Sequence, residues 1–152
     1  MDREDTSVGR SELRIGAGLG PRFFARLIDS LLIGVVSVYV ISMSGIGIGF
    51  TANTLSVAIV IGYFTVAESY TGRTIGKMAL RLQTVGPDGR NPSLEMAFRR
   101  NIWYLLGMLP YLGGIAEVAA VVAVAVTISR SPINVGWHDR FAPGTRVLAN
   151  AR

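Results

Sequence analysis

The chain has 152 residues, of which 50% are hydrophobic and only 16% are charged, and its mean hydropathy is +0.43. Soluble domains carry about 25% charged residues, so this composition excludes an ordinary soluble domain and indicates a membrane protein of one domain. The net charge of +5 is then attributed to basic loops facing anionic lipid, and no nucleic-acid partner is expected. The chain has no cysteine, which excludes disulfides, thiolate metal sites and cysteine nucleophiles.

The N-terminal part of the chain predicts a tail followed by a first membrane span. Residues 1–20 contain charges and glycines but lack the apolar segment of a signal peptide, so a flexible cytoplasmic tail is expected. The first helix is expected at about 23–50. Its charge-free part, Leu31–Phe50, spans roughly 30 Å as a helix, which is enough to cross the hydrocarbon. A short turn is expected near Thr51–Thr54.

Two further apolar blocks follow. The second expected helix, 53–69, spans only if its polar ends lie in the headgroup regions, and Glu68 is expected to mark its end. A third helical segment is expected over 93–129, with a break near 110–114. Its apolar part, 102–128, is long for one straight span and short for two. It forms either one kinked helix or a hairpin that folds at "LPYLGG".

The distribution of basic residues predicts the topology. The chain has five arginines up to Arg26, five more plus Lys77 in the segment 70–101, and none between the first two blocks. By the positive-inside rule, the N-terminus and the central loop are cytoplasmic. Four more arginines after Ser129 favour the hairpin for the third block. Fourteen of the fifteen basic residues are arginine, a bias that suggests a bacterial genome, so the expected location is the plasma (inner) membrane of a bacterium, crossed several times.

The central loop contains patterns of its own. "LRLQTV" alternates apolar and polar residues and precedes the turn sequence "GPDGRN", which predicts a small cytoplasmic β-hairpin or an extended arm. "NPS" at 91–93 is typical of a helix start, and the helix after it is expected to lie in the membrane plane. Four of its residues are assigned to the membrane interface: Arg99, Arg100, Trp103 and Tyr104.

Three charged residues share one face of the first helix. Arg22, Arg26 and Asp29 lie within about 60° of each other at 100° per residue, and Arg26 and Asp29 have the spacing of a direct ion pair. A carboxylate in hydrocarbon is costly, so Asp29 is expected to face the bundle and find a partner. Three interpretations stay open: an anchor at the interface, a polar site for an ion or substrate, and a contact with another protein.

The stretch "TGRTIGK" superficially resembles a phosphate-binding loop. That motif requires four residues between glycine and glycine-lysine and then serine or threonine, whereas three residues and Met78 occur here. Nucleotide binding is therefore excluded. A tight turn leaving the second span, with Arg73 and Lys77 near lipid phosphates, is expected instead.

The remaining polar candidates do not form a catalytic constellation. His138 and Asp139 lack the partners of a metal site or a triad, so no enzymatic activity, metal or cofactor is expected. Asp139 is expected to form a salt bridge with an arginine of the first helix or the central loop. Glu117 is surrounded by apolar residues. It either pairs with Asp29 to bind a cation or proton, or lies near the lipid boundary.

Three separated stretches together resemble the RDD family of small bacterial integral membrane proteins: "RFFARLID", "GRTIGKMALRLQTV" and "WHDRFAPGTRV". The resemblance covers about residues 20–148. It maps the family's arginine and two aspartates onto Arg22, Asp29 and Asp139, and its central stretch includes Lys77. It implies a polytopic membrane protein with a suggested transport role, and cation–proton exchange has been proposed for some members.

Taken together, the expected fold is an all-α polytopic bundle with three apolar blocks, three or four membrane-embedded helices and a small cytoplasmic loop or hairpin. The membrane domain is assigned to 21–148, and 149–152 is a C-terminal tail. The candidate polar site comprises Arg22, Asp29 and Asp139, and its expected supporting residues are Arg26, Glu117, Lys77 and His138. Three short blocks are few to enclose a pathway, so a transporter is expected to form a homo-oligomer. The alternative is a non-catalytic accessory or assembly subunit of a larger membrane complex.

Overall fold

The computed structural model describes residues 16–109, 111–142 and 144–149. Among these residues, three helices are long and apolar enough to cross a membrane. The elements in chain order are α1 (Leu19–Ser44), α2 (Phe50–Thr71), α3 (Ile75–Ala79), β1 (Leu82–Val85), α4 (Leu94–Asn101), the 3-10 helix η2 (Ile102–Met108), α5 (Gly113–Arg130), α6 (Trp137–Phe141) and β2 (Arg146–Ala149). The spans are α1, α2 and α5, which confirms the predicted helical membrane fold.

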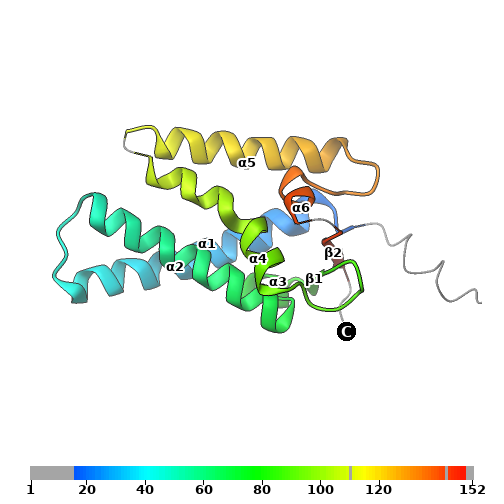
Figure 1. Ribbon diagram of the computed structural model, residues 1–152, viewed down its shortest axis with the longest axis horizontal. Coiled ribbons are helices and arrows are strands. Elements are labelled where there is room, and N and C mark those ends of the chain that lie inside the picture. The colour runs from blue at the N-terminus through cyan, green and yellow to red at the C-terminus, as the bar shows by residue number, and fades with distance from the viewer. Residues whose placement is uncertain (1–15, 110, 143, 150–152) are drawn as a thin grey trace, which may run out of the picture.

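The helices form two hairpins that lie against each other (Figure 1). The first hairpin is α1 and α2, and the second consists of α4 and η2 running out and α5 returning. The third apolar block is therefore a hairpin and not one kinked helix. Both hairpin turns lie at one end of the bundle, whereas α3, α6, β1 and β2 gather at the other end, which we call the base.

The first helix is displaced toward the N-terminus relative to the predicted 23–50. It ends at Ser44 because Gly45 adopts a left-handed conformation, with φ of 68°, which is the usual glycine termination of a helix. The turn therefore occupies 45–49, and the predicted turn at Thr51–Thr54 lies inside α2. At the other end, Ala17 donates a backbone hydrogen bond of 2.7 Å to Val147. The last residues of the expected tail 1–20 thus belong to the folded domain, and 1–15 lie outside the described residues.

The strand predicted in "LRLQTV" is present, but of the two alternatives predicted for this loop the local β-hairpin is not formed. β1 pairs in antiparallel register with β2, so that Leu82 lies opposite Ala149 and Val85 opposite Arg146. The turn sequence "GPDGRN" leads into α4 instead of a neighbouring strand. A partner more than sixty residues away in sequence leaves no local pattern, which is why only the strand itself was predictable. Ala149 ends β2, and the rest of the expected tail 149–152 lies outside the described residues.

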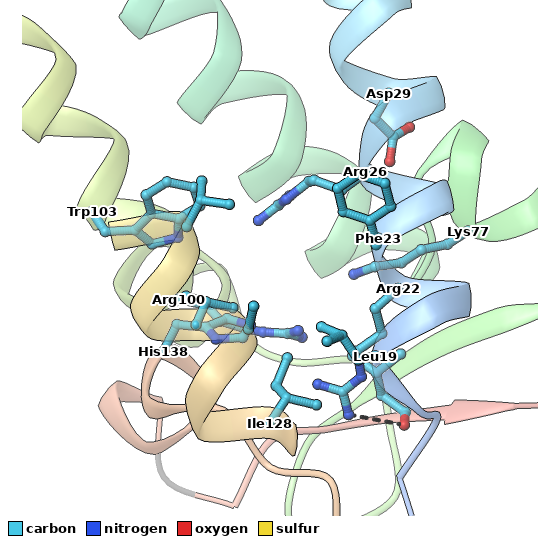
Figure 2. Close-up of a pocket in the computed structure, with 14 residues that line it drawn as sticks. Leu19, Arg22, Phe23, Arg26, Asp29, Lys77, Arg100, Trp103, Ile128 and His138 are labelled. Atoms are coloured by element: carbon cyan, nitrogen blue, oxygen red, sulfur yellow. Dashed lines mark hydrogen bonds between the residues drawn. The ribbon is translucent and has the colours of Figure 1, made fainter. Parts of the chain in front are cut away.

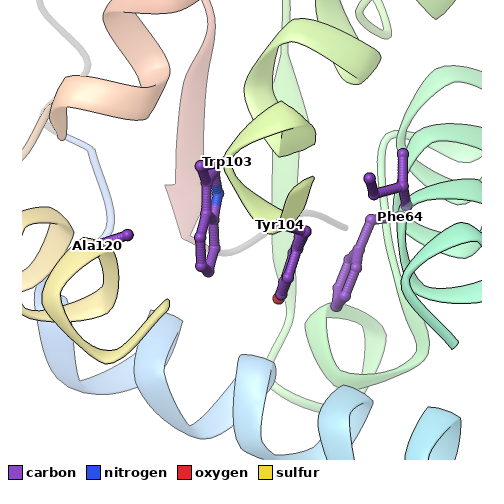
Figure 3. Packing of buried hydrophobic residues seen from close by; sticks show 5 residues of the cluster. Phe64, Trp103, Tyr104 and Ala120 are labelled. Carbon is purple, nitrogen blue, oxygen red and sulfur yellow. The ribbon is translucent and has the colours of Figure 1, made fainter. Parts of the chain in front are cut away.

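An aromatic stack joins the two hairpins (Figure 3). The ring of Tyr104 lies between those of Phe64 and Trp103, with centroid distances of 5.6 and 4.0 Å, and Ala120 of α5 completes the cluster. Trp103 and Tyr104 are buried in the bundle, as is Arg100, so their predicted place at the interface is wrong. Arg99, by contrast, is exposed.

Candidate functional site

A chain of alternating charges is buried at the base of the bundle. The guanidinium of Arg22 lies 2.8 Å from Asp139, and that of Arg100 lies 2.9 Å from Asp139 and 3.6 Å from Glu68. The ammonium of Lys77 contacts the other oxygen of Glu68 at 2.5 Å. Each of these side chains is at most 9% exposed. The predicted salt bridge between Asp139 and an arginine of the first helix is confirmed, and a second arginine comes from α4.

Neutral groups complete the hydrogen bonding around Glu68 and Lys77. Lys77 also donates to the hydroxyl of Thr84 at 2.7 Å, and the amide of Asn101 donates to Glu68 at 3.4 Å. Desolvating an ion costs several kcal/mol, and this is offset only when charges are paired and the remaining donors and acceptors are bonded. The network therefore joins α1, α2, α3, α4 and α6 by contacts that depend on each other.

Burial and charge shift the pKa values of groups at the base outside the spans. Burial alone would raise the pKa of Asp139, but Arg100 and Arg22 outweigh it and hold the pKa below its ordinary value. Burial lowers the pKa of Lys77 to about 8, although Glu68 acts in the opposite direction, so the ammonium is charged at pH 7. Burial lowers the pKa of His138 to about 3, despite Asp139 at 3.3 Å from its Nε2, so the imidazole is neutral.

His138 offers a direct test of this burial because the chain has a single histidine. Its imidazole resonances in detergent micelles should titrate with a midpoint near 3, far below the ordinary 6.5. The folded protein holds the ring neutral, whereas the unfolded chain binds a proton below pH 6.5. The contribution of His138 to the free energy of unfolding is therefore full above pH 6.5 and is lost as the pH falls toward 3. An NMR titration checks it, and a midpoint above 6 would show that the ring is accessible to water.

Asp29 does not pair with Arg26, and the predicted ion pair is wrong. Its carboxylate accepts hydrogen bonds from the hydroxyls of Tyr63 and Thr74 and from the backbone N–H of Gly76, at 2.7, 2.5 and 2.8 Å. The backbone N–H of Ile75 donates to the Tyr63 hydroxyl. Asp29 and its partners thus satisfy the free N–H groups at the start of α3. Its role in the fold is to fix this short helix against α1.

Each characteristic residue of "GRTIGK" has a local reason in the structure. Gly72 ends α2 in a left-handed conformation with φ of 70°, and Thr74 is the N-cap of α3. Gly76 lies so close to α1 that a Cβ there would overlap the carbonyl oxygen of Ala25. The predicted tight turn is confirmed, whereas the expected contact of Lys77 with lipid phosphates is wrong because Lys77 is buried against Glu68.

Arg26 has no carboxylate partner among the described residues. Its guanidinium lies 3.9 Å from the centroid of the Phe64 ring and 5.2 Å from that of Tyr104, and it donates to the side-chain oxygen of Asn101 at 3.1 Å. A cation above an aromatic ring gains about 0.5–2 kcal/mol. The desolvation cost of an ion is larger than this gain. Of the four cations that line the cavity, Arg26 is thus the one that forms no salt bridge with a carboxylate of the described residues.

A cavity of about 100 Å³ adjoins the network, between α1 and α5. Figure 2 shows Arg26, Lys77 and Arg100 reaching into the same space from α1, α3 and α4. Three buried donor atoms of residues that line this cavity have no hydrogen-bond partner among the described residues: Arg22 Nε, Arg100 Nη1 and Trp103 Nε1. The residues that line the cavity therefore carry positive charge and buried donors without a hydrogen-bond partner.

The charges around the cavity do not balance. The cavity wall and the network beside it hold four cations and three carboxylates: Arg22, Arg26, Lys77 and Arg100 against Asp29, Glu68 and Asp139. His138 also lines the cavity and is neutral. One positive charge remains, which suits an anion better than a cation.

Glu117 is not part of this group. Its carboxylate lies beside Gly107 of η2, where a Cβ on Gly107 would be 3.3 Å from Oε2. Asp29 lines the cavity and Glu117 does not. The predicted carboxylate pair of Asp29 and Glu117 is therefore not formed, and the alternative, a position near the lipid boundary, stays a prediction.

Two residues at the centre of the network were missed as site residues in the sequence. Glu68 was recognised only as the end of a span, and it lies three residues before the end of α2, as that prediction requires. Arg100 was placed at the interface. The sequence did contain a signal for their contact. Glu68 ends a span and Arg100 lies in a later helix, so the two can meet when the loop between α2 and α4 folds back.

The comparisons with known proteins agree with these features. The family model of the RDD family matches residues 16–143, which includes all three apolar spans and the residues of the network. No curated protein and no solved structure matches the chain. On the family match and its three membrane-spanning helices, the chain is a multi-pass membrane protein that belongs to the RDD family.

Proposed function

We propose that this chain is a non-catalytic membrane protein that binds a small oxyanion, of the phosphate type, in the cavity between α1 and α5. The excess of one positive charge around the cavity carries the proposal. Arginine and lysine side chains are the usual ligands of phosphate groups. Arg26, which has no carboxylate partner among the described residues, supplies the charge, and the buried donors Arg22 Nε and Trp103 Nε1 supply hydrogen bonds.

Cation or proton exchange, which the family resemblance implies, is less well supported by this site. Asp29 accepts three hydrogen bonds, and Asp139 contacts two guanidinium groups. A cation that bound either carboxylate would have to displace these partners and would add to the positive charge already there. An anion requires neither change. If the protein transports its ligand, the ligand is therefore expected to be anionic.

The orientation of the bundle fits the same proposal. The described turns at the end opposite the base, 45–49 and 111–112, carry no charge, whereas Lys77 and nearly all described arginines lie at the base. The positive-inside rule assigns the base to the cytoplasm of a bacterium, with the N-terminus on the same side. The cavity would then receive its anion from the cytoplasm or from the inner leaflet.

Titration with inorganic phosphate at constant ionic strength tests the binding. Trp103 lines the cavity, and a Trp137→Phe background leaves it as the sole tryptophan. Its fluorescence should change saturably, and Arg26→Gln should weaken binding by about tenfold or more, the worth of a hydrogen bond to a charged group. Arg99→Gln is the matched control because Arg99 is exposed and, in the described part of the chain, its salt bridge is with Glu95 of the same helix. A wild-type response that does not saturate, or one that Arg26→Gln leaves unchanged, would contradict the proposal.

A further inference from the structure

The shape of the cavity wall allows the ligand class to be named. We infer that the bound anion is the phosphodiester headgroup of an anionic phospholipid, whose acyl chains leave the cavity sideways between α1 and α5. This inference rests on the proposed anion binding and adds the source of the phosphate. It is carried by three observations: an apolar wall, an outward opening and the size of the charge excess.

The wall of the cavity away from the cations is apolar. Four residues of α5 that recur every three or four positions share one face of this helix and line the cavity: Val121, Val124, Ala125 and Ile128. Leu19 and Phe23 of α1 stand across from them. A free phosphate ion would gain nothing from this apolar surface, whereas a lipid presents a charged group and hydrocarbon in the same molecule.

The apolar wall continues to the outer surface of the bundle. Phe23 and Val121 line the cavity, yet they are 55% and 43% exposed. α1 and α5 make few contacts with each other, since each packs mainly on other elements. Both helices are long and apolar enough to cross a membrane, so in this proposal the gap between them opens toward the hydrocarbon of the bilayer. An acyl chain can therefore pass from the cavity into the membrane without crossing a polar surface.

The charge excess matches a phosphodiester. The cavity wall and the network beside it hold one positive charge more than they hold carboxylates, and a phosphodiester carries one negative charge. An uncharged lipid would leave Arg26 uncompensated. An anionic lipid such as phosphatidylglycerol neutralises it and places its chains along α5.

Lipid titration of the full chain in micelles of an uncharged detergent provides the test, again with Trp103 as the reporter. Three additions are compared: phosphatidylglycerol, diacylglycerol and inorganic phosphate. Phosphatidylglycerol should bind saturably and about tenfold or more tightly than diacylglycerol, because only the former supplies a charged hydrogen-bond acceptor. Arg26→Gln should remove that preference, and Arg26→Lys should retain most of it.

A second set of variants tests whether the acyl chains of the lipid pass along α5. Ala125→Phe, and in smaller measure Ala125→Leu, fills the apolar wall and should weaken phosphatidylglycerol binding. Ala123→Phe is the control because Ala123 is exposed on α5 and does not line the cavity. Monodisperse elution of each variant shows that it is folded.

The outcomes separate the two proposals. Phosphate binding without any preference for phosphatidylglycerol over diacylglycerol overturns the lipid inference and leaves anion binding standing. Equal binding of phosphatidylglycerol by Ala125→Phe and Ala123→Phe overturns the proposed path of the acyl chains along α5. If neither phosphate nor phosphatidylglycerol responds to Arg26→Gln, both proposals are wrong.

Discussion

Asp139→Asn is expected to destabilise the protein by about 3–5 kcal/mol, the usual cost of removing one partner from a buried ion pair. Asp139 is the only carboxylate that the structure places against both Arg22 and Arg100 among the described residues. Asparagine keeps the size of the side chain but removes the charge, so two buried guanidinium groups would repel each other. Because this carboxylate joins α1, α4 and α6, its loss should loosen the whole base.

The free energy of unfolding in mixed detergent micelles, followed by tryptophan fluorescence, measures the effect. Glu95→Gln is the matched control because it also neutralises a carboxylate paired with an arginine, but on the exposed surface of α4. Exposed pairs of this spacing contribute only about 0.2–0.5 kcal/mol. Equal losses in the two variants would show that the buried network does not hold the base together.

Gly76→Ala should be almost as damaging, although it adds only one methyl group. The new Cβ would overlap the carbonyl oxygen of Ala25 and lie 3.0 Å from Cγ of Asp29, so α3 must move away from α1. That movement breaks the hydrogen bond from Gly76 to Asp29 and withdraws Lys77 from Glu68. Overpacking costs about 1–3 kcal/mol, and the lost polar contacts add to it.

Gly34→Ala is the control, because it shows the effect of replacing a helical glycine by alanine where no neighbouring atom is close. Gly34 lies within α1, and a Cβ there meets no atom within 4 Å. Alanine favours a helix over glycine by about 1 kcal/mol, so this variant should be neutral or slightly more stable. Thermal unfolding of both variants in one detergent makes the comparison. A Gly76→Ala protein as stable as Gly34→Ala would mean that α3 packs differently.

The spans were predictable because their signal is local. The length and apolarity of each block, and the glycines and proline between them, identify α1, α2 and the hairpin of the third block. The bounds were less accurate where a single backbone conformation decides them, as at Gly45. The strand at 82–85 was also local, but its pairing with 146–149 was not.

The site was predictable only in part, for a physical reason. Arg22 and Asp139 could be expected to meet, because the positive-inside rule places both residues on the same side of the membrane. The partner of Asp29 could not be foreseen, because helical spacing favoured Arg26, whereas Tyr63 and Thr74 reach Asp29 only when α3 packs on α1. Likewise, the aromatic face that receives Arg26 depends on Phe64 of a different helix.

The ion pair of Arg22 with Asp139 also has a consequence for how the protein is made. The two residues are 117 positions apart, so Arg22 enters the membrane well before its counter-charge has been synthesised. Until then its charge can hold the first helix in place at the anionic membrane surface. Its ion pair can form only after Asp139 of α6 has been synthesised. Closure of the base therefore requires that α6 has been synthesised, and a chain that ended before α6 would keep its three spans but leave the guanidinium groups of Arg22 and Arg100 without Asp139.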